Sequence, residues 1–212
     1  MDKNRLTSIN IKKTAVIVVD MQNDFVAEGA PLYSDMGNKM MPRMVDFLDA
    51  CRNKGMMIIY TEHVFRKDGV DLGQFARMWP NLIGVTALLD DSRGGRVHDM
   101  VAPKEGDVVI KKRGYSAFPD TELETILKTC GIDTVCITGV ATDFCCFGTA
   151  RDAMTLNYNV AFLSDLTGTF DIPDLGYGSI GAEAQHQVTL ANIAMSTGDV
   201  MTSEKFLELT EK

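Results

Sequence analysis

Five short apolar runs rich in Val and Ile constrain the fold of this chain more than any other feature. They are "TAVIVV" (14–19), "MMIIY" (56–60), "DVVIK" (107–111), "TVCITG" (134–139) and "NVAFLS" (159–164). Each run is nearly continuous in apolar residues rather than alternating, which is typical of strands that a parallel sheet buries on both faces. We therefore expect these runs to form the strands of a mostly parallel sheet.

Helical patterns separate the runs. We expect helices over 37–55, 118–131, 142–157 and 182–198, then a short strand at 199–202 and a helix over 203–212. Strand–helix–strand repetition implies right-handed crossovers, because the intervening helix packs back onto the sheet in only that sense. The sequence thus predicts an α/β protein, a three-layer α/β/α sandwich forming a single domain over residues 1–212.

Two long segments, 61–106 and 165–182, hold glycines and polar residues and contain no comparable run. Irregular stretches of this length in a compact protein are often binding loops or lids. For the second segment a lid, an arm between subunits and a surface loop all remain open.

Composition excludes several classes of function. The chain of 212 residues is 45% hydrophobic and 24% charged, with a net charge of -8. A negative protein repels polyanions and anionic membrane surfaces, so we expect no nucleic-acid partner and no membrane association. The polar start "MDKNRLTSINIKK" does not resemble a signal peptide. The five cysteines therefore indicate reduced thiols and a cytoplasmic protein, and the absence of any C-x-x-C pair argues against a structural zinc site.

Polar residues follow three of the predicted strands. Asp20 comes directly after the first, Lys111 and Lys112 end or follow the third, and Cys145 lies shortly after the fourth. Ligands of open parallel sheets bind beyond the carboxyl ends of the strands, so a carboxylate, an amine and a thiol should meet there.

A thiol at that place requires activation, because a free cysteine with a pKa of about 8.5 is mostly protonated at neutral pH. Thr142 and Asp143 are favourable N-cap residues, so Cys145 should lie in the first turn of a helix, where the helix terminus and a nearby cation would lower its pKa. Asp20 could accept the thiol proton, and a lysine could stabilise the charges. This pattern indicates nucleophilic catalysis.

Three stretches, "DMQNDF", "KKRGYSAF" and "GVATDFCCFGTARDA", resemble the signature segments of the isochorismatase-like cysteine hydrolases. The resemblance implies a parallel six-stranded sheet and a catalytic triad of Asp20, Lys112 and Cys145, selecting Lys112 over Lys111 and Cys145 over Cys146. It also implies a cis peptide bond before Ala141 and an oxyanion hole formed by the N–H groups of Ala141 and Cys145.

The stretch "CCFGTARDAMTLNYNVAFLSD" looks most like the ureidoacrylate amidohydrolase branch. This likeness implies cleavage of the C–N bond of a small ureido or carbamoyl substrate through a thioester, with no cofactor. Biuret, triuret and N-carbamoylsarcosine hydrolysis, a nicotinamidase-like amidase, vinyl ether hydrolysis of the isochorismatase type and a non-catalytic scaffold remain alternatives. Relatives form dimers or tetramers, so a homo-oligomer is expected.

Nicotinamidases of this family bind a metal through an Asp-x-His pair and further histidines. Here Thr61 stands in the aspartate position and only His63 is beside it, so we predict no catalytic metal.

Further residues are candidates for substrate contact or for packing. Phe25 and Trp79 could hold a planar ureido group between them, as flat apolar walls suit such ligands. Other candidate substrate contacts are Tyr115 and Gln22, and Arg66, Lys67 and Arg77 for a substrate carboxylate. Asn23 and Asp24 should fix their own turn, and Lys111 should face solvent or an interface. We expect Cys51, Cys130, Cys136 and Cys146 to pack in the core; the roles of His63 and His186 stay open.

Overall fold

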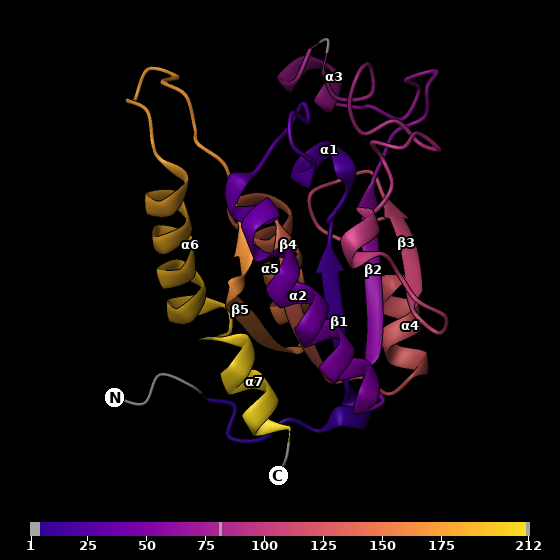
Figure 1. Cartoon of the computed structure of the whole chain (residues 1–212), viewed down its shortest axis with the longest axis vertical. Coiled ribbons are helices and arrows are strands. Elements are labelled where there is room, and N and C mark those ends of the chain that lie inside the picture. The colour runs from indigo at the N-terminus through magenta and orange to yellow at the C-terminus, as the bar shows by residue number, and fades with distance from the viewer. Residues whose placement is uncertain (1–4, 81, 211–212) are drawn as a thin grey trace.

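Six parallel strands form one sheet at the centre of the molecule (Figure 1). The computed structural model describes residues 5–80 and 82–210. In chain order the strands are β1 (Thr14–Val19), β2 (Met57–His63), β3 (Val108–Lys112), β4 (Thr134–Val140), β5 (Asn159–Gly168) and β6 (Asp199–Met201). They are arranged in the order β3-β2-β1-β4-β5-β6, and every pair is parallel. The predicted α/β class and parallel sheet are confirmed.

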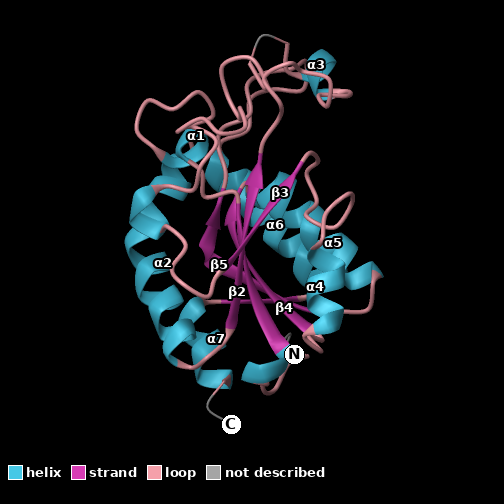
Figure 2. Cartoon of the chain, turned by 90° about the vertical axis from the view of Figure 1, so that its right-hand side faces the viewer, coloured by secondary structure: helices cyan, strands magenta, loops and turns pink. Residues whose placement is uncertain are grey.

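Helices cover both faces of the sheet, as the edge-on view shows (Figure 2). On one face α2 (Asp35–Asn53) and α7 (Ser203–Leu209) contribute Met44, Leu48 and Phe206 to an apolar cluster that also includes residues of β1, β2 and β5. On the other, α4 (Leu123–Thr129), α5 (Phe147–Thr155) and α6 (Ala182–Ser196) contribute to a second apolar cluster that includes Ile17 and Ile137. This burial on two sides explains why the strand runs are continuously apolar, and it confirms the three-layer sandwich.

The strand order places a topological switch between β1 and β4. From β1 the chain builds outward through β2 to β3 on one side, and from β4 through β5 to β6 on the other. Crevices at the carboxyl ends of such a central pair are where open α/β sheets bind ligands. Gly139 belongs to this pair: its φ is +111°, and a Cβ there would lie 2.0 Å from the backbone oxygen of Val19. Only glycine allows β1 and β4 to approach this closely.

Two elements differ from the sequence prediction, one because of a side-chain interaction and the other because of a backbone conformation. β5 runs on to Gly168, although Ser164 and Asp165 resemble the start of a loop; the Asp165 carboxylate accepts hydrogen bonds from the backbone and hydroxyl of Ser203. The helix expected over 118–131 begins only at Leu123, since Asp120 adopts a left-handed φ of 57° that a helix cannot contain.

The two long segments carry little regular structure. Beyond the end of β2, the described residues of segment 61–106 form only two helical elements, α3 (Phe75–Met78) and a 3₁₀ turn, Asp99–Val101. In the second segment Ile172 and Ile180 form an isolated antiparallel bridge, and Figure 1 shows the chain between them extending away from the sheet before α6. A short helix, α1 (Asn23–Val26), follows β1.

Within the described residues, no helix has both the length and the apolar character to cross a bilayer.

The prediction of a buried Cys130 is wrong, because it caps the exposed end of α4; Cys51, Cys136 and Cys146 are buried as expected.

Candidate active site

Three chain segments bring Asp20, Lys112 and Cys145 to the switch point of the sheet. Asp20 follows β1 directly and adopts a left-handed φ of 49°, which is uncommon outside glycine and turns its side chain into the crevice. Lys112 is the last residue of β3, two strands away. Neighbouring strands lie about 4.8 Å apart, so only a long side chain can cross β2 to reach Asp20. Cys145 lies in a single π-helical turn, Thr142–Cys146, after β4.

The Lys112 ammonium is the centre of this cluster. Its Nζ lies 2.8 Å from Oδ2 of Asp20 and 3.3 Å from Sγ of Cys145. It also donates to the backbone oxygens of Gly114 at 2.8 Å and Tyr115 at 3.0 Å. Asp20 and Lys112 have no exposed surface. Burial by itself would lower the pKa of Lys112, but the ion pair with Asp20 outweighs it and raises the pKa, so the amine is cationic.

Thr61, on β2 between the two ion-pair partners, orients the carboxylate. Its hydroxyl donates to Oδ1 of Asp20 and accepts from the backbone N–H of Asp20 at 3.1 Å. The sequence identified this position only as a missing metal ligand. No signal in the sequence alone identifies this role, because it depends on the parallel register that pairs Thr61 with Val19, the residue before Asp20.

The Cys145 thiol is buried rather than primed as thiolate. Burial raises its pKa and Asp20 raises it further, while the charge of Lys112 opposes both. The expectation of a lowered pKa is therefore wrong, because desolvation exceeds the effect of the cation. A protonated thiol next to a carboxylate needs that carboxylate as a base at the moment of attack.

The turn that carries Cys145 is held by its neighbours rather than by an N-cap. Thr142 Oγ1 lies 2.9 Å from Nδ1 of His186, and the Asp143 carboxylate binds the hydroxyl of Thr169 and the amide of Gln185. The predicted capping role of Thr142 and Asp143 is wrong, since both lie inside the turn and tie it to α6 and to Thr169, the residue after β5. His186 also contacts the backbone oxygen of Ser164 at 3.0 Å, which gives it a structural role.

The peptide bond between Val140 and Ala141 is cis, as the resemblance implied. The carbonyl of Ala141 accepts from the backbone of Phe144 and Cys146. In the part of the chain that the structure describes, neither the Ala141 nor the Cys145 N–H donates a backbone hydrogen bond outside helices and strands. Amides at the start of a helical turn lack intrahelical partners, so both are candidates for binding an anionic oxygen.

His63 ends β2 beside the thiol, with Nδ1 3.9 Å from Sγ of Cys145. Its ring is 2% exposed, and Nε2 has no hydrogen-bond partner of good geometry. Burial and the nearby Lys112 charge lower its pKa well below the ordinary value, which outweighs the opposite effect of the Arg113 backbone. The imidazole is therefore neutral at physiological pH.

A narrow cavity of about 30 Å³ opens directly over Cys145. Predicted substrate contacts Phe25, Trp79 and Tyr115 all line it. The remaining lining residues are Leu32, His63, Ile83, Leu88, Ala141, Phe144 and Phe170. It continues into a larger vestibule of about 510 Å³, and the two share Leu32, Trp79, Tyr115, Phe144 and Phe170. The inner space suits one small planar group, and the vestibule is of the size of ordinary ligand pockets.

Gln22 lies outside both spaces. Its amide donates to the backbone oxygens of His63 at 3.0 Å and Gly95 at 2.8 Å, and its Oε1 accepts from the His63 N–H. The geometry thus gives no support for a substrate contact by Gln22; it joins the end of β2 to the loop above. Asn23 and Asp24 act similarly on that loop, since Asn23 donates to Arg93 and Arg96 and Asp24 accepts from the Leu88 N–H.

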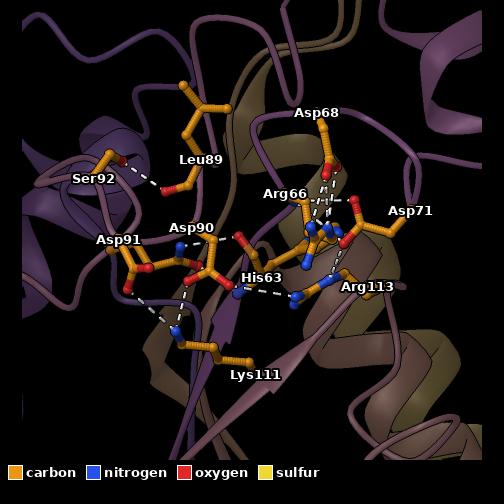
Figure 3. Close-up of polar contacts among 11 residues, drawn as sticks. His63, Arg66, Asp68, Asp71, Leu89, Asp90, Asp91, Ser92, Lys111 and Arg113 are labelled. Carbon is orange, nitrogen blue, oxygen red and sulfur yellow. Dashed lines mark hydrogen bonds and ion pairs between the residues drawn. The ribbon is translucent and has the colours of Figure 1, made fainter.

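The cations of the loop after β2 lie apart from the cavity. Arg66 forms an ion pair with Asp68 at 2.7 Å, and with Lys67 it lines a separate surface hollow. Figure 3 shows this ionic cluster, in which Arg113 joins Asp71 and Asp90, and Lys111 reaches Asp90 and Asp91. Arg77 is exposed on α3 and lines neither space. The geometry gives no support for contacts between these arginines and a substrate carboxylate, whereas Lys111 is exposed as predicted.

One donor set could in principle hold a metal ion among the described residues. Ligand atoms of Asp20, His63 and Cys145 lie within 4.8 Å of one another. The Lys112 ammonium contacts both the carboxylate and the sulfur, however, and Thr61 occupies the other carboxylate oxygen. Because the Lys112 cation already contacts two of the three donor groups, it would repel a divalent ion bound there.

The fold and this cluster define a class: an α/β protein with a buried Cys–Lys–Asp cluster at its sheet's switch point. The isochorismatase domain family matches residues 14–205, and the chain belongs to that family.

A crystal structure of a cysteine hydrolase from Pseudomonas syringae pv. phaseolicola 1448A superposes with a TM-score of 0.92 at 34% identity, covering 96% of this chain and 95% of that one. Among characterised sequences, ureidoacrylate amidohydrolase RutB of Azorhizobium caulinodans is 32% identical over 76% of this chain and 78% of its own length. An Arabidopsis thaliana protein named "Probable inactive nicotinamidase" is 32% identical over 74% of this chain and 81% of its own. The names of these three relatives thus differ in the activity that they state.

Proposed function

We propose that this protein is a cysteine amidohydrolase that cleaves the C–N bond of a small ureido or carbamoyl compound. The observation that carries the proposal is the contact of one buried ammonium, Lys112 Nζ, with both Asp20 Oδ2 at 2.8 Å and Cys145 Sγ at 3.3 Å beside an open cavity. Burying an ion pair of this kind costs desolvation energy. Buried pairs with perturbed pKa values are therefore found mainly at sites where the charges have a function.

In the proposed reaction the Cys145 sulfur attacks the substrate carbonyl carbon while Asp20 takes the thiol proton. The carbonyl oxygen becomes an oxyanion that accepts hydrogen bonds from the N–H groups of Ala141 and Cys145. When this intermediate collapses, the C–N bond breaks and Asp20 returns the proton to the leaving nitrogen.

The thioester that remains is then hydrolysed. Water adds to its carbonyl carbon and gives a proton to Asp20, and the C–S bond breaks to release the acid and the cysteine sulfur, which regains the proton. Lys112 stays charged throughout and stabilises the anionic sulfur and carboxylate. Since the resting thiol is protonated, proton transfer to Asp20 accompanies the attack.

The relatives support the reaction class. One is named an amidohydrolase of ureidoacrylate, and the superposed crystal structure is named a cysteine hydrolase. A homo-oligomer and a cytoplasmic location remain predictions of the sequence.

Ammonia release from a panel of ureidoacrylate, biuret, N-carbamoylsarcosine and nicotinamide tests the proposal. Cys145→Ala should lose turnover at least 1,000-fold, on the order expected when a nucleophile is removed, with an unchanged circular dichroism spectrum. Cys146→Ala, the adjacent buried cysteine, is the matched control and should retain activity. If Cys145→Ala hydrolyses a panel member as fast as the unmodified protein, the thioester mechanism is wrong.

The relative named as inactive gives one alternative a specific basis: a non-catalytic binding protein on the same fold. In that case no panel member would be hydrolysed, while isothermal titration would still detect binding that competes with alkylation of Cys145.

A further inference from the structure

Among the described residues, no Arg or Lys lines the cavity or the vestibule. The polar side chains that line the vestibule are those of Asp171, Tyr33 and Tyr115, and Trp79 adds an indole N–H. Of the described residues that line the vestibule, Asp171 alone has a charged side chain, a carboxylate.

Lys112, Arg113 and Arg66 are each paired with acidic groups. Arg77 on α3 is exposed and lines neither space. Lys112 has four acceptors around its ammonium and no exposed surface. Arg113 contacts Asp71 at 2.6 Å and Asp90 at 3.4 Å, and Arg66 contacts Asp68 (Figure 3). None of them lines the space where a substrate would lie beyond its reacting carbonyl.

The walls of the site are instead flat and apolar. Aromatic rings follow one another from the end of β2 to the start of the segment after β5: His63 to Phe75 at 5.2 Å, Phe75 to Tyr115 at 5.1 Å, Tyr115 to Phe144 at 5.5 Å and Phe144 to Phe170 at 5.7 Å. Phe25 and Trp79 also line the inner cavity. Such surfaces attract planar apolar groups.

We infer that this site selects uncharged, planar amides or ureas with an apolar substituent, and discriminates against substrates that carry a carboxylate. The inference rests on the proposed function and narrows its substrate class. Moving a carboxylate from water into an apolar pocket without a counter-ion is costly. This desolvation cost is not offset by the neutral His63, by the carboxylate of Asp171 or by the net charge of -8.

Matched substrate pairs that differ by one carboxylate test the inference. Phenylurea is compared with 4-ureidobenzoate, and methyl 3-ureidoacrylate with 3-ureidoacrylate, by ammonia release. We expect kcat/KM to be at least tenfold higher for the uncharged member of each pair, which corresponds to about 1.4 kcal/mol. An equal or higher kcat/KM for both anionic members overturns the inference but leaves the proposed function intact. If no uncharged pair member releases ammonia while a compound of the panel above does, the inference alone fails. If neither the pairs nor that panel release ammonia, the proposed function itself fails.

Two variants locate the origin of the discrimination. Asp171→Asn retains the oxygen that accepts the Ala182 N–H but removes the negative charge, so the preference should narrow a few-fold. Asp174→Asn is the control, because Asp174 caps Gly176 and Gly178 in the same segment without lining the vestibule. Leu175→Arg, at a position 74% exposed on the vestibule wall, should raise kcat/KM for the anionic members selectively. An unchanged ratio in both Asp171→Asn and Leu175→Arg contradicts a role for vestibule charge.

Discussion

The Thr61 hydroxyl donates a hydrogen bond to Oδ1 of Asp20 and accepts one from the backbone N–H of the same residue. One side chain thus fixes both the left-handed backbone and the carboxylate of the proposed base. The other oxygen, Oδ2, is left to Lys112. This arrangement makes Thr61 a positioning residue rather than a vacant metal ligand.

Replacing Thr61 by valine should therefore impair activity without changing side-chain volume much. We expect kcat to fall about 10- to 100-fold, because a displaced catalytic group is costly even when the shift is small. The free energy of unfolding should fall by about 1–3 kcal/mol, since two buried polar atoms lose their partner. Thr61→Ser keeps the hydroxyl and should recover most of kcat; a Thr61→Val enzyme with unchanged kcat would contradict the role.

Lys112 and Lys111 offer a matched pair on one strand, the first buried against Asp20 and the second exposed beside Asp90. Lys112→Met should destabilise the protein by about 3–5 kcal/mol and abolish turnover, because Asp20 is left buried without a counter-ion. Lys111→Met should cost about 0–1 kcal/mol and leave activity near normal. Urea unfolding measures both, and similar losses for the two variants would contradict the assignment.

The same lysine predicts an alkaline limit of stability. Its pKa is raised above 10.5 in the folded protein, so its contribution is complete below that pH and is lost as the pH rises through the folded pKa. The advantage of the unmodified protein over Lys112→Met should hold up to about pH 10.5 and shrink above it. Urea midpoints of the two proteins against pH would show this, and a constant difference would refute it.

His63 should carry no charge in the working enzyme. Its pKa is lowered, so the unfolded chain binds a proton at mildly acidic pH where the folded protein does not, and stability falls as pH drops below about 6.5. In His63→Gln the loss of stability at acidic pH should be smaller. The pH profiles of kcat/KM for the unmodified enzyme and for His63→Gln should have the same shape near pH 6.5. A limb of the pH–rate profile that disappears in His63→Gln would mean that the imidazolium takes part.

The burial of Cys145 predicts that its thiol is alkylated slowly. Because its pKa is raised above 9.0, labelling by iodoacetamide should still be rising at pH 9.0 rather than reaching a plateau near neutrality. Exposed Cys130 should be labelled first, as peptide mass mapping would reveal. A plateau for Cys145 below about pH 8 would show that the resting site already holds a thiolate.

The sequence predicted the sheet well because burial on two faces leaves a signal in every central strand. The first strand, Thr14–Val19, has the expected bounds, and β2 to β4 differ by one to three residues at either end. The signal fails where a polar side chain finds a distant partner. Asp165 continues β5 because Ser203, far along the chain, satisfies its carboxylate.

The site was only partly predictable for a related reason. Asp20, Lys112 and Cys145 meet as expected because parallel strands present their carboxyl ends at one edge. Gln22 and Arg66 were candidates by chain proximity, yet the backbone of His63 and the carboxylate of Asp68 engage them elsewhere. Thr61 could not be assigned, since its partner depends on a strand register that a single sequence does not reveal.

By itself the sequence determined the layered architecture and which residues could carry chemistry, because apolar runs and their flanking polar residues are local properties. Only the tertiary structure decided how closely the Lys112 ammonium approaches both Asp20 and Cys145, that the thiol rests protonated, and that no cation lines the substrate space in the described chain. These properties depend on desolvation and on distances of a few ångströms between segments remote in the chain, and local patterns do not encode such distances.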